Sequence, residues 1–267
     1  MGEGKYRGYS VARMIARCLL PALSSVALSP PSAADTWGGS IALTSDYFVR
    51  GISRSNDQAA LQGDVHLASA SGFFGGLFAS SVQIDSNDSR NGELSAFFGF
   101  TWAAGSDWRN KIVIDHYSYP WNAAGSHYNY DELSFDAAYQ DWLDLSVVYS
   151  PNTPRTVLLP GPPQYPGNSE YPVYTQYPSL IRVTAKSIEM NLQSPRSHRV
   201  AATAGVGYSY LDGPDAAGYT YWSLGANYDL APLSVSLSYV DTTAAAKALF
   251  YNEAAHGRWT ATLILHF

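Results

Sequence analysis

The chain has little charge, almost no cysteine and no long apolar run after its first residues. Charged residues make up 14% of its 267 residues, against the roughly 25% usual in soluble domains. The single cysteine, Cys18, lies near the N-terminus, so the rest of the chain has no disulfide framework and no thiol chemistry. After residue 34 no stretch of about 18 apolar residues occurs, which excludes a transmembrane helix there.

Aromatic residues are abundant instead. They make up 14% of the chain and include 20 Tyr and 7 Trp, while the mean hydropathy is only −0.14. A transmembrane β-barrel has strands that are half lipid-facing and half polar, so its average hydropathy is modest. This composition favours a barrel, and 267 residues can form one domain of this kind.

Residues 1–34 have the pattern of a signal peptide. A basic region precedes the apolar stretch Cys18–Leu28, and Ser32-Ala33-Ala34 resembles a cleavage site. We therefore predict cleavage near Ala34 and a mature barrel of residues 35–267. Cleavage would remove four basic residues and one acid and leave a net charge of −9. Such an acidic chain is not expected to bind nucleic acid.

Apolar and polar residues alternate along much of the mature chain. Leu233, Val235 and Leu237, for example, are separated by Ser234 and Ser236. A period of two predicts strands with one apolar face, and no segment shows a sustained helical stripe. The sequence predicts twelve strands, near 39–51, 60–70, 72–85, 92–104, 108–118, 130–140, 142–150, 181–192, 199–211, 219–230, 232–241 and 258–267.

The expected connections alternate between short and long. This sorting is typical of outer-membrane barrels, which have short periplasmic turns and longer external loops, and a soluble β-sandwich gives no reason for it. We predict an all-β fold, a transmembrane antiparallel up-and-down barrel of about twelve strands. The longest connection, 151–180, is rich in Pro and Tyr. So much proline excludes a central strand, and we expect an ordered cap that narrows the external entrance; the alternative is an exposed surface loop.

The chain ends on an amphipathic strand. Trp259, Leu263, Leu265 and Phe267 share one face, while polar residues share the other. A last strand that ends in Phe resembles the signal read by the barrel-assembly machinery, so we interpret Phe267 as an assembly signal.

Strand parity also predicts which charges face the lumen, because charges cost roughly 2–4 kcal/mol on the lipid face at mid-membrane. With Gln62 and Glu93 included, the expected lumen has seven acids and three bases. A ring of carboxylates favours cations. The alternative is a lumen plugged by paired charges, such as Arg50 with Asp64. The charged residues expected to line the pore are Asp46, Arg50, Asp64, His66, Lys111, Asp115, Glu132, Asp136, Glu189 and Arg258.

The opening of the mature chain carries a resemblance to a known family. Ser45-Asp46-Tyr47, Arg50-Gly51 and Ser53 are followed by Leu61-Gln62-Gly63. This stretch resembles the hallmark of the TorF family of outer-membrane porins, except that the usual Gln after Ser53 is Arg54. Tyr130–Leu133, Tyr149–Pro151 and the Phe ending are also similar. The resemblance implies an outer-membrane channel with no known substrate and no catalytic set.

Two other groups of residues could form chemical sites. His116 and Ser118 resemble part of an outer-membrane lipase site, but parity places them on the lipid side with Ile112 and Ile114. The neighbouring Tyr117 and Tyr119 are instead expected in an interfacial aromatic girdle. Acidic residues of the second long loop could bind Ca²⁺, although a solvated turn is the favoured interpretation; these are Asp85, Asn87 and Asp88.

These observations predict a porin-like channel for passive diffusion of small polar solutes or ions. The alternative is a non-conducting barrel that displays its loops, and an outer-membrane lipase comes third. We expect no enzyme activity, no cofactor and no bound metal. The expected partners are outer-membrane lipid, the barrel-assembly machinery and the small polar solutes themselves.

Overall fold

The structure is a computed structural model that describes residues 35–83, 92–122, 125–164, 173–214, 216–250 and 253–267. Residues 158–164 and 173–178 are described by their backbone alone. The predicted signal peptide, residues 1–34, lies outside the described residues.

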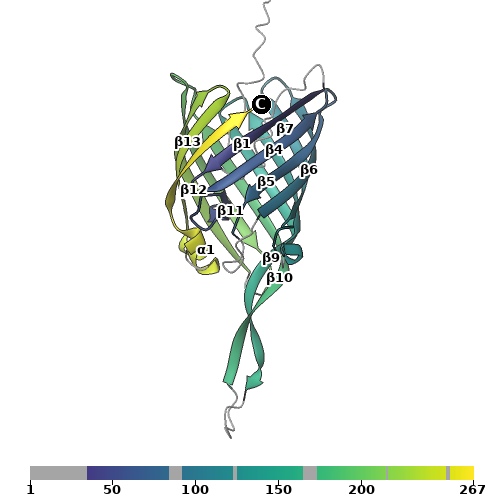
Figure 1. The fold of residues 1–267 in the computed structure, drawn as a ribbon, viewed down its shortest axis with the longest axis vertical. Coiled ribbons are helices and arrows are strands. Elements are labelled where there is room, and N and C mark those ends of the chain that lie inside the picture. Colours follow the sequence, from purple (N-terminus) through teal and green to yellow (C-terminus); the bar gives the residue numbers. More distant parts are fainter. Residues whose placement is uncertain (1–34, 84–91, 123–124, 165–172, 215, 251–252) are drawn as a thin grey trace, which may run out of the picture.

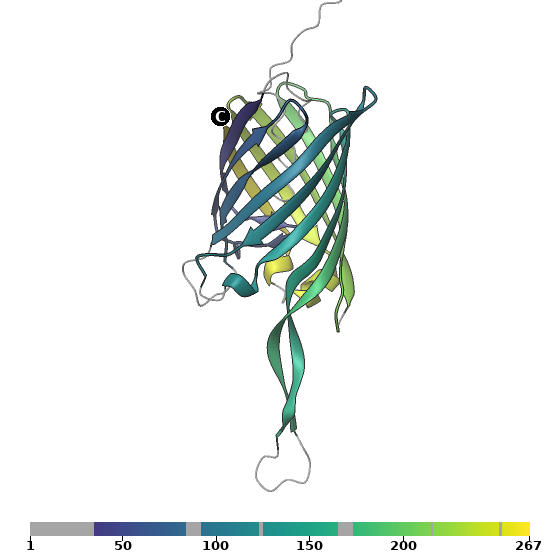
Figure 2. The same cartoon turned by 90° about the vertical axis from the view of Figure 1, so that its right-hand side faces the viewer.

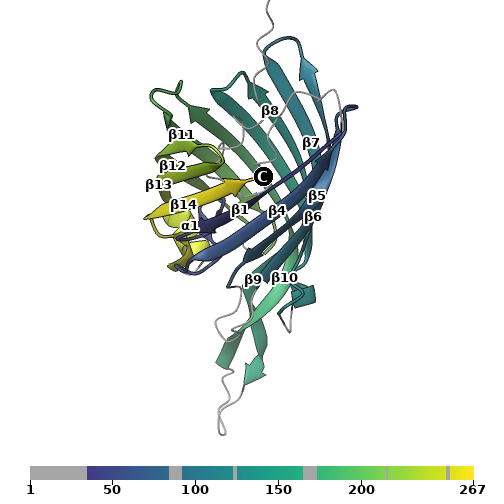
Figure 3. The same ribbon diagram turned by 45° about the horizontal axis from the view of Figure 1, so that its top comes forward.

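Twelve antiparallel strands close into one barrel, as the sequence predicts. Each strand pairs with its neighbours in the chain, and the first pairs with the last (Figure 3). The barrel strands are β1 (Thr36–Thr44), β4 (Ala60–Ala68), β5 (Phe73–Ser81), β6 (Gly92–Ala104), β7 (Trp108–Ser118), β8 (Tyr130–Tyr139), β9 (Leu143–Gln164), β10 (Val173–Gln193), β11 (Val200–Leu211), β12 (Ala217–Leu230), β13 (Leu233–Thr242) and β14 (Arg258–His266).

Because apolar and polar residues alternate along the strands, the barrel wall has an apolar outer face and a largely polar inner face. In β13, Ser236 and Ser238 are buried inside the barrel, whereas Val235 and Leu237 are exposed on its outer surface. Successive side chains of a strand point to opposite faces, so each apolar residue of this pattern faces outward. The result is an apolar exterior around a largely polar interior.

The two ends of the barrel differ. The connections at 69–72, 105–107, 140–142, 194–199 and 231–232 are short and lie at the end where β1 begins and the chain terminates, here called the termini end (Figure 1). The other connections lie at the opposite end, here called the arm end because β9 and β10 project from it as a long two-stranded arm (Figures 1 and 2). Most of them are longer, so the predicted sorting of connections by length is present, with the exception of the short connection 212–216.

The arm corrects the prediction for residues 151–180. Most of this segment belongs to β9 and β10, and its described part leads away from the barrel instead of folding over its mouth. Beyond Ser150 and before Thr184, the two strands pair only with each other. Each therefore has a free edge, and an edge accepts proline because no N–H is needed there. The expected cap is wrong for the described residues, and residues 165–172 lie outside them.

Three connections at the arm end contain secondary structure that the sequence did not predict. The connection after β1 carries a small hairpin, β2 (Phe48–Val49) and β3 (Ile52–Ser53), so β1 ends at Thr44 and not near residue 51. The connection after β13 carries α1 (Ala244–Leu249) and the 3₁₀ turn η3 (Glu253–Ala255); another such turn, η2 (Gly125–His127), precedes β8. No helix in the described part of the chain is long and apolar enough to cross a membrane.

The seam between β1 and β14 is closed at the last residue. The backbone N–H of Phe267 donates to the carbonyl of Gly39 at 3.1 Å, and the N–H of Gly39 donates back at 3.0 Å. The Phe267 ring lies 6.3 Å from the ring of Trp37, and both side chains are exposed on the outside. The outward face of the last strand is as the sequence predicts.

Candidate functional site

The hairpin β2–β3 turns into the barrel instead of lying over its rim. All residues from Asp46 to Ser53 are buried. Its turn residues, Arg50 and Gly51, have φ of 51° and 77°, and two-residue hairpin turns with this twist need positive φ at both positions. A Cβ on Gly51 would lie 2.6 Å from Cβ of Tyr221 on β12 and 2.7 Å from Cγ2 of Thr242 on β13. The tip therefore fits against the far wall only without a side chain.

The turn places Arg50 between two carboxylates of the wall. Its terminal nitrogens donate to both oxygens of Glu132 on β8, each at 2.8 Å. Its Nε lies 3.7 Å from Oε1 of Glu189 on β10, which also accepts a 2.7 Å hydrogen bond from the hydroxyl of Tyr221. Burial acts to lower the pKa of Arg50, but Glu132 and Glu189 raise it more, so the net shift is upward and the guanidinium stays charged.

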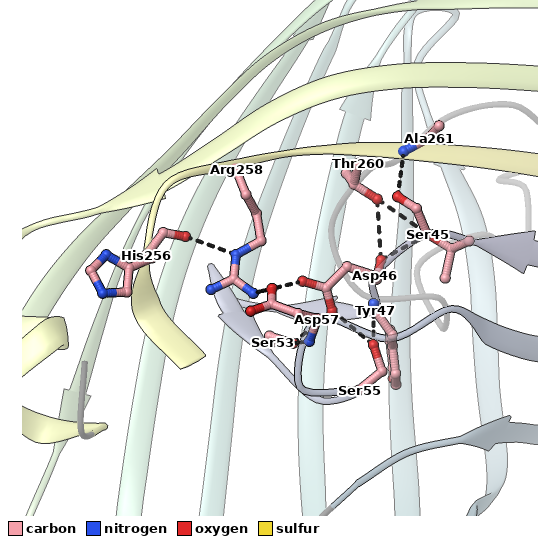
Figure 4. A network of polar contacts seen from close by, with 11 residues as sticks. Ser45, Asp46, Tyr47, Ser53, Ser55, Asp57, His256, Arg258, Thr260 and Ala261 are labelled. Carbon is pink, nitrogen blue, oxygen red and sulfur yellow. Dashed lines mark hydrogen bonds and ion pairs between the residues drawn. The ribbon is translucent and has the colours of Figure 1, made fainter. Parts of the chain in front are cut away.

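The base of the hairpin is held by Asp46 (Figure 4). Oδ1 of Asp46 accepts hydrogen bonds from the hydroxyls of Ser53 at 2.6 Å and Ser55 at 2.7 Å. Oδ2 of Asp46 pairs with the guanidinium of Arg258 on β14 at 3.2 Å, and Arg258 also contacts Asp57. This group ties the two ends of the hairpin to each other and to the last strand of the barrel.

Glu93 on β6 holds the tyrosine side of the hairpin. Its carboxylate is fully buried and accepts hydrogen bonds from the hydroxyls of Tyr47 at 3.0 Å and Tyr119 at 2.8 Å. Burial, and then the charge of Glu93, raise the pKa of both tyrosines well above their usual value, so both remain donors. Arg54 lies nearby, 6.0 Å from the centre of the Tyr130 ring.

Apolar side chains fill both flanks of the hairpin. One cluster lies toward β4–β8, where Tyr47 and Val49 are buried together with aromatic side chains of the wall. The other lies toward β10–β12, where Ile52 is buried with wall residues and with Ala246 of α1. The members beyond these are Ala60, Phe78, Val82, Tyr117, Tyr119 and Tyr130 in the first cluster, and Val183, Ala185, Leu211, Tyr219, Tyr221 and Ala255 in the second.

The other residues predicted to line the pore lie in smaller groups. Asp115 accepts a 2.7 Å hydrogen bond from Ser95, and Nζ of Lys111 lies 3.6 Å from Asp136. Asp64 contacts the Ser40 hydroxyl and lies 2.8 Å from Nδ1 of His66. The predicted pairing of Arg50 with Asp64 is wrong, because the inward turn carries Arg50 away from β4 and toward β8 and β10.

The alternation of residues in the sequence was not used to predict the tyrosines that are buried inside the barrel. Tyr117 and Tyr119, which the sequence places in an aromatic girdle, are buried inside the barrel, and the Tyr117 ring stacks on Tyr130 with centroids 4.4 Å apart. The inward parity of Asp115 was the signal that could have found Tyr117, since the two are separated by one residue. For Tyr119, which follows β7, no such signal exists.

The lipase interpretation finds no support in the geometry. His116 is exposed on the outer face, and its Nδ1 lies 2.7 Å from Asp131. The hydroxyl of Ser118 donates to the Leu94 carbonyl at 3.1 Å. No cluster of three metal-binding side chains occurs among the described residues, and Asp85, Asn87 and Asp88 lie outside them.

Comparison with solved structures gives the fold. The NanC porin is 6% identical with a TM-score of 0.50, and the match covers 87% of this chain and 99% of that one. A chain from a study of the in-meso crystallization of membrane proteins is 10% identical with a TM-score of 0.51, covering 87% of this chain and 83% of that one. The KdgM porin is 10% identical with a TM-score of 0.48, covering 86% and 99%. The barrel is thus similar in fold to outer-membrane porins.

Comparison with curated proteins gives no match. A match to a protein family covers the whole barrel. The resemblance to the TorF family remains a prediction, since the description of the matched family does not bear that name. The chain belongs to the family described as "Bacterial protein of unknown function (Gcw_chp)", which it matches over residues 29–267.

Proposed function

We propose that this protein is an outer-membrane channel through which small polar solutes or ions diffuse passively. In the orientation that we propose, the termini end of the barrel faces the periplasm and the arm end faces the outside of the cell. The barrel crosses the lipid and lowers the barrier with a polar lumen, so neither a catalytic group nor an energy source is needed. The fold shared with porins is consistent with this function but does not by itself assign it.

The observation that carries the proposal is the small, polar inner face of β10–β14. A barrel that served only as a scaffold could fill its lumen with large side chains, as small barrels do. Beside the apolar cluster that contains Ile52, many inward side chains along these strands carry hydroxyls or amides, which suit a hydrated lumen. They include Ser187, Ser209, Ser223, Asn227, Ser234, Ser236, Ser238, Thr242 and Thr260.

Carboxylates on the inner faces of β6, β7, β8 and β10 support a preference for cations. Glu93, Asp115, Glu132, Asp136 and Glu189 are all buried on the inner faces of β6, β7, β8 and β10. Carboxylates that line a narrow pore attract cations and repel anions. We propose a mild cation preference once the path through the barrel is open.

The outer surface of the barrel and its last strand support two further proposed partners, outer-membrane lipid and the barrel-assembly machinery. Exposed apolar side chains surround the barrel, which suits outer-membrane lipid. The last strand, with Phe267 exposed on its outer face, suits recognition by the barrel-assembly machinery. Both partners belong to the proposal, together with the removal of residues 1–34 as a signal peptide.

A conductance measurement tests the channel. The variant to use replaces residues 48–53 with Gly and Ser of equal length, because this change removes the internal hairpin and leaves all twelve barrel strands. Folding would be checked by heat-modifiable migration and β-sheet circular dichroism. In planar bilayers we expect stepwise conductance from the folded variant; a folded variant that stays silent would show that the barrel is not a channel.

The arm favours one second candidate, a barrel that displays a surface structure. Most of the paired segment beyond Ser150 and before Ala185 projects from the arm end, and only its base, at Val183, packs in the apolar cluster that contains Ile52. An arm of this kind suits contact with other molecules outside the cell. Joining Thr156 to Leu180 through Asn-Gly would remove it, and loss of surface attachment by intact cells with unchanged conductance would support display.

A further inference from the structure

We infer that the internal hairpin is a plug that holds the channel closed at the arm end, and that Arg50 keeps it seated through Glu132 and Glu189. The plug is defined as residues 45–59, which include β2 and β3. This inference rests on the proposed channel function and adds its regulation.

The plug reaches strands on widely separated parts of the wall. Tyr47 bonds to Glu93 on β6, Arg50 pairs with Glu132 on β8, and Gly51 lies against Tyr221 on β12. Asp46 pairs with Arg258 on β14. The plug starts from β1 and returns to β4, so its contacts with β6, β8 and β12 require it to extend across the lumen, whereas β14 is the neighbour of β1.

The space beside the plug is filled by apolar side chains. Val49 faces the cluster toward β4–β8, and Ile52 faces the cluster toward β10–β12. Helix α1 adds to the second cluster, since Ala246 is fully buried there. A hydrated ion that passed between these apolar side chains would lose water without gaining polar partners there, so the seated plug obstructs passage.

The plug is a separate part of the structure. Strands β2 and β3 pair only with each other, in a two-stranded sheet distinct from the barrel. Displacing them breaks no hydrogen bond between barrel strands. The twelve-stranded wall can therefore stay closed while the plug moves, which distinguishes a plug from a part of the wall.

The hold on the plug depends on buried charge. The guanidinium of Arg50 is about 10% exposed and the carboxylate of Glu132 about 9%. Breaking a buried pair by removing one partner leaves the other charge buried and unpaired, which is strongly unfavourable. Removing Arg50 leaves Glu132 and Glu189 without their shared cation, and both become hydrated when the plug leaves. The seated state is therefore weakened more than the displaced state.

Single-channel recording compares four proteins: wild type, Arg50→Ala, the Gly/Ser replacement of residues 48–53, and Lys186→Ala as the matched control. The Lys186→Ala substitution also removes one positive charge, but Lys186 lies exposed on the outer face of β10. We expect brief, rare openings from the wild type and the control. Arg50→Ala should raise the open probability about tenfold or more, since it leaves two buried charges unpaired, and the replacement should conduct steadily.

A thiol probe reports whether the plug is seated, and it does not rely on conductance. In a Cys18→Ser background, Ile52→Cys places the only thiol on the buried flank of the plug. A membrane-impermeant maleimide should label it slowly, and about tenfold or more faster when Arg50→Ala is added, because of the same unpaired charges. Equal labelling rates would show that Arg50 does not seat the plug.

The outcomes separate the two proposals. A wild type that conducts as steadily as the replacement variant would overturn the plug and leave the channel intact. A folded replacement variant that stays silent would instead refute the channel function. An effect of Lys186→Ala equal to that of Arg50→Ala would overturn the role assigned to Arg50.

Discussion

The guanidinium of Arg50 and the carboxylate of Glu132 form a fork of two 2.8 Å hydrogen bonds across the lumen, although the two residues are 82 positions apart in sequence. Replacing Glu132 with Gln keeps the shape of the side chain and removes its charge. We expect the free energy of unfolding to fall by about 3–5 kcal/mol, the usual effect of breaking a buried ion pair. Denaturant unfolding of the purified protein in detergent would measure it.

The control for that prediction is Asp141→Asn. Asp141 pairs with Arg109 at the termini end, with its side chain 66% exposed, and exposed pairs contribute about 0–1 kcal/mol. If both variants unfold at the same denaturant concentration, the pair of Arg50 with Glu132 contributes no more than a surface contact.

Gly51 should tolerate no side chain. Gly51→Ala adds a Cβ at positive φ and within 2.6 Å of Tyr221 Cβ, and we expect destabilisation of about 1–3 kcal/mol from backbone strain alone, with crowding added to it. Gly105→Ala is the matched control, because Gly105 has φ of 71° and open space around it. An equal loss of stability in the two variants would show that crowding at the tip of the plug is unimportant.

Ion selectivity can be measured in the barrel without its plug. With residues 48–53 replaced, Arg50 no longer offsets the acids of the wall, so reversal potentials in a salt gradient should show cation preference. The additional changes Glu132→Gln and Asp136→Asn should weaken this preference. Anion selectivity would contradict the prediction and would point to Lys111 or Arg258 as the controlling charge.

Deleting Phe267 should lower the amount of folded protein in the outer membrane. The deletion removes the ring that lies against Trp37 and the paired hydrogen bonds to Gly39, as well as the residue interpreted as an assembly signal. Heat-modifiable protein in the outer-membrane fraction would be measured against Phe267→Tyr, which keeps the ring. Normal levels of folded protein after the deletion would refute the assembly role.

The arm should not affect conductance. Joining Thr156 to Leu180 through Asn-Gly preserves the register of β9 and β10, because these two residues are already partners. Since the described part of the arm leads away from the mouth, we expect the barrel to fold and its conductance to stay within twofold or so. A several-fold rise in conductance would mean that the arm narrows the entrance after all.

Most of the barrel could be predicted from the sequence because side-chain parity has a physical cause. Ser236 and Ser238 would be costly on the lipid face, and Val235 and Leu237 would gain nothing from the lumen, so their alternation determines the strand and its orientation. The same reasoning placed Glu132, Asp136 and Glu189 together on the inner face, where the structure buries them. Parity alone does not predict the ion pairs, because it gives the face on which a charged residue lies but not its partner.

The plug could not be predicted because its residues continue the alternation of β1. Asp46, Phe48 and Arg50 read as one more face of a longer strand, and an Arg-Gly turn lacks the Asn-Gly or Asp-Gly signature of tight hairpins. What bends the chain inward is distant: Arg258 for Asp46, and Glu132 for Arg50. The arm was missed for a different reason, because proline excludes a strand inside a sheet but not at a free edge.

The contact between Asp46 and Arg258 links the plug to the order in which the protein is made. Asp46 follows the first barrel strand and Arg258 begins the last one, so the two partners are 212 positions apart in the sequence. Contacts between such distant segments form late, because the chain between them must first be ordered. A nascent barrel whose final strand has not docked lacks this partner for Asp46, so we expect the plug to make all of its contacts only when assembly is complete.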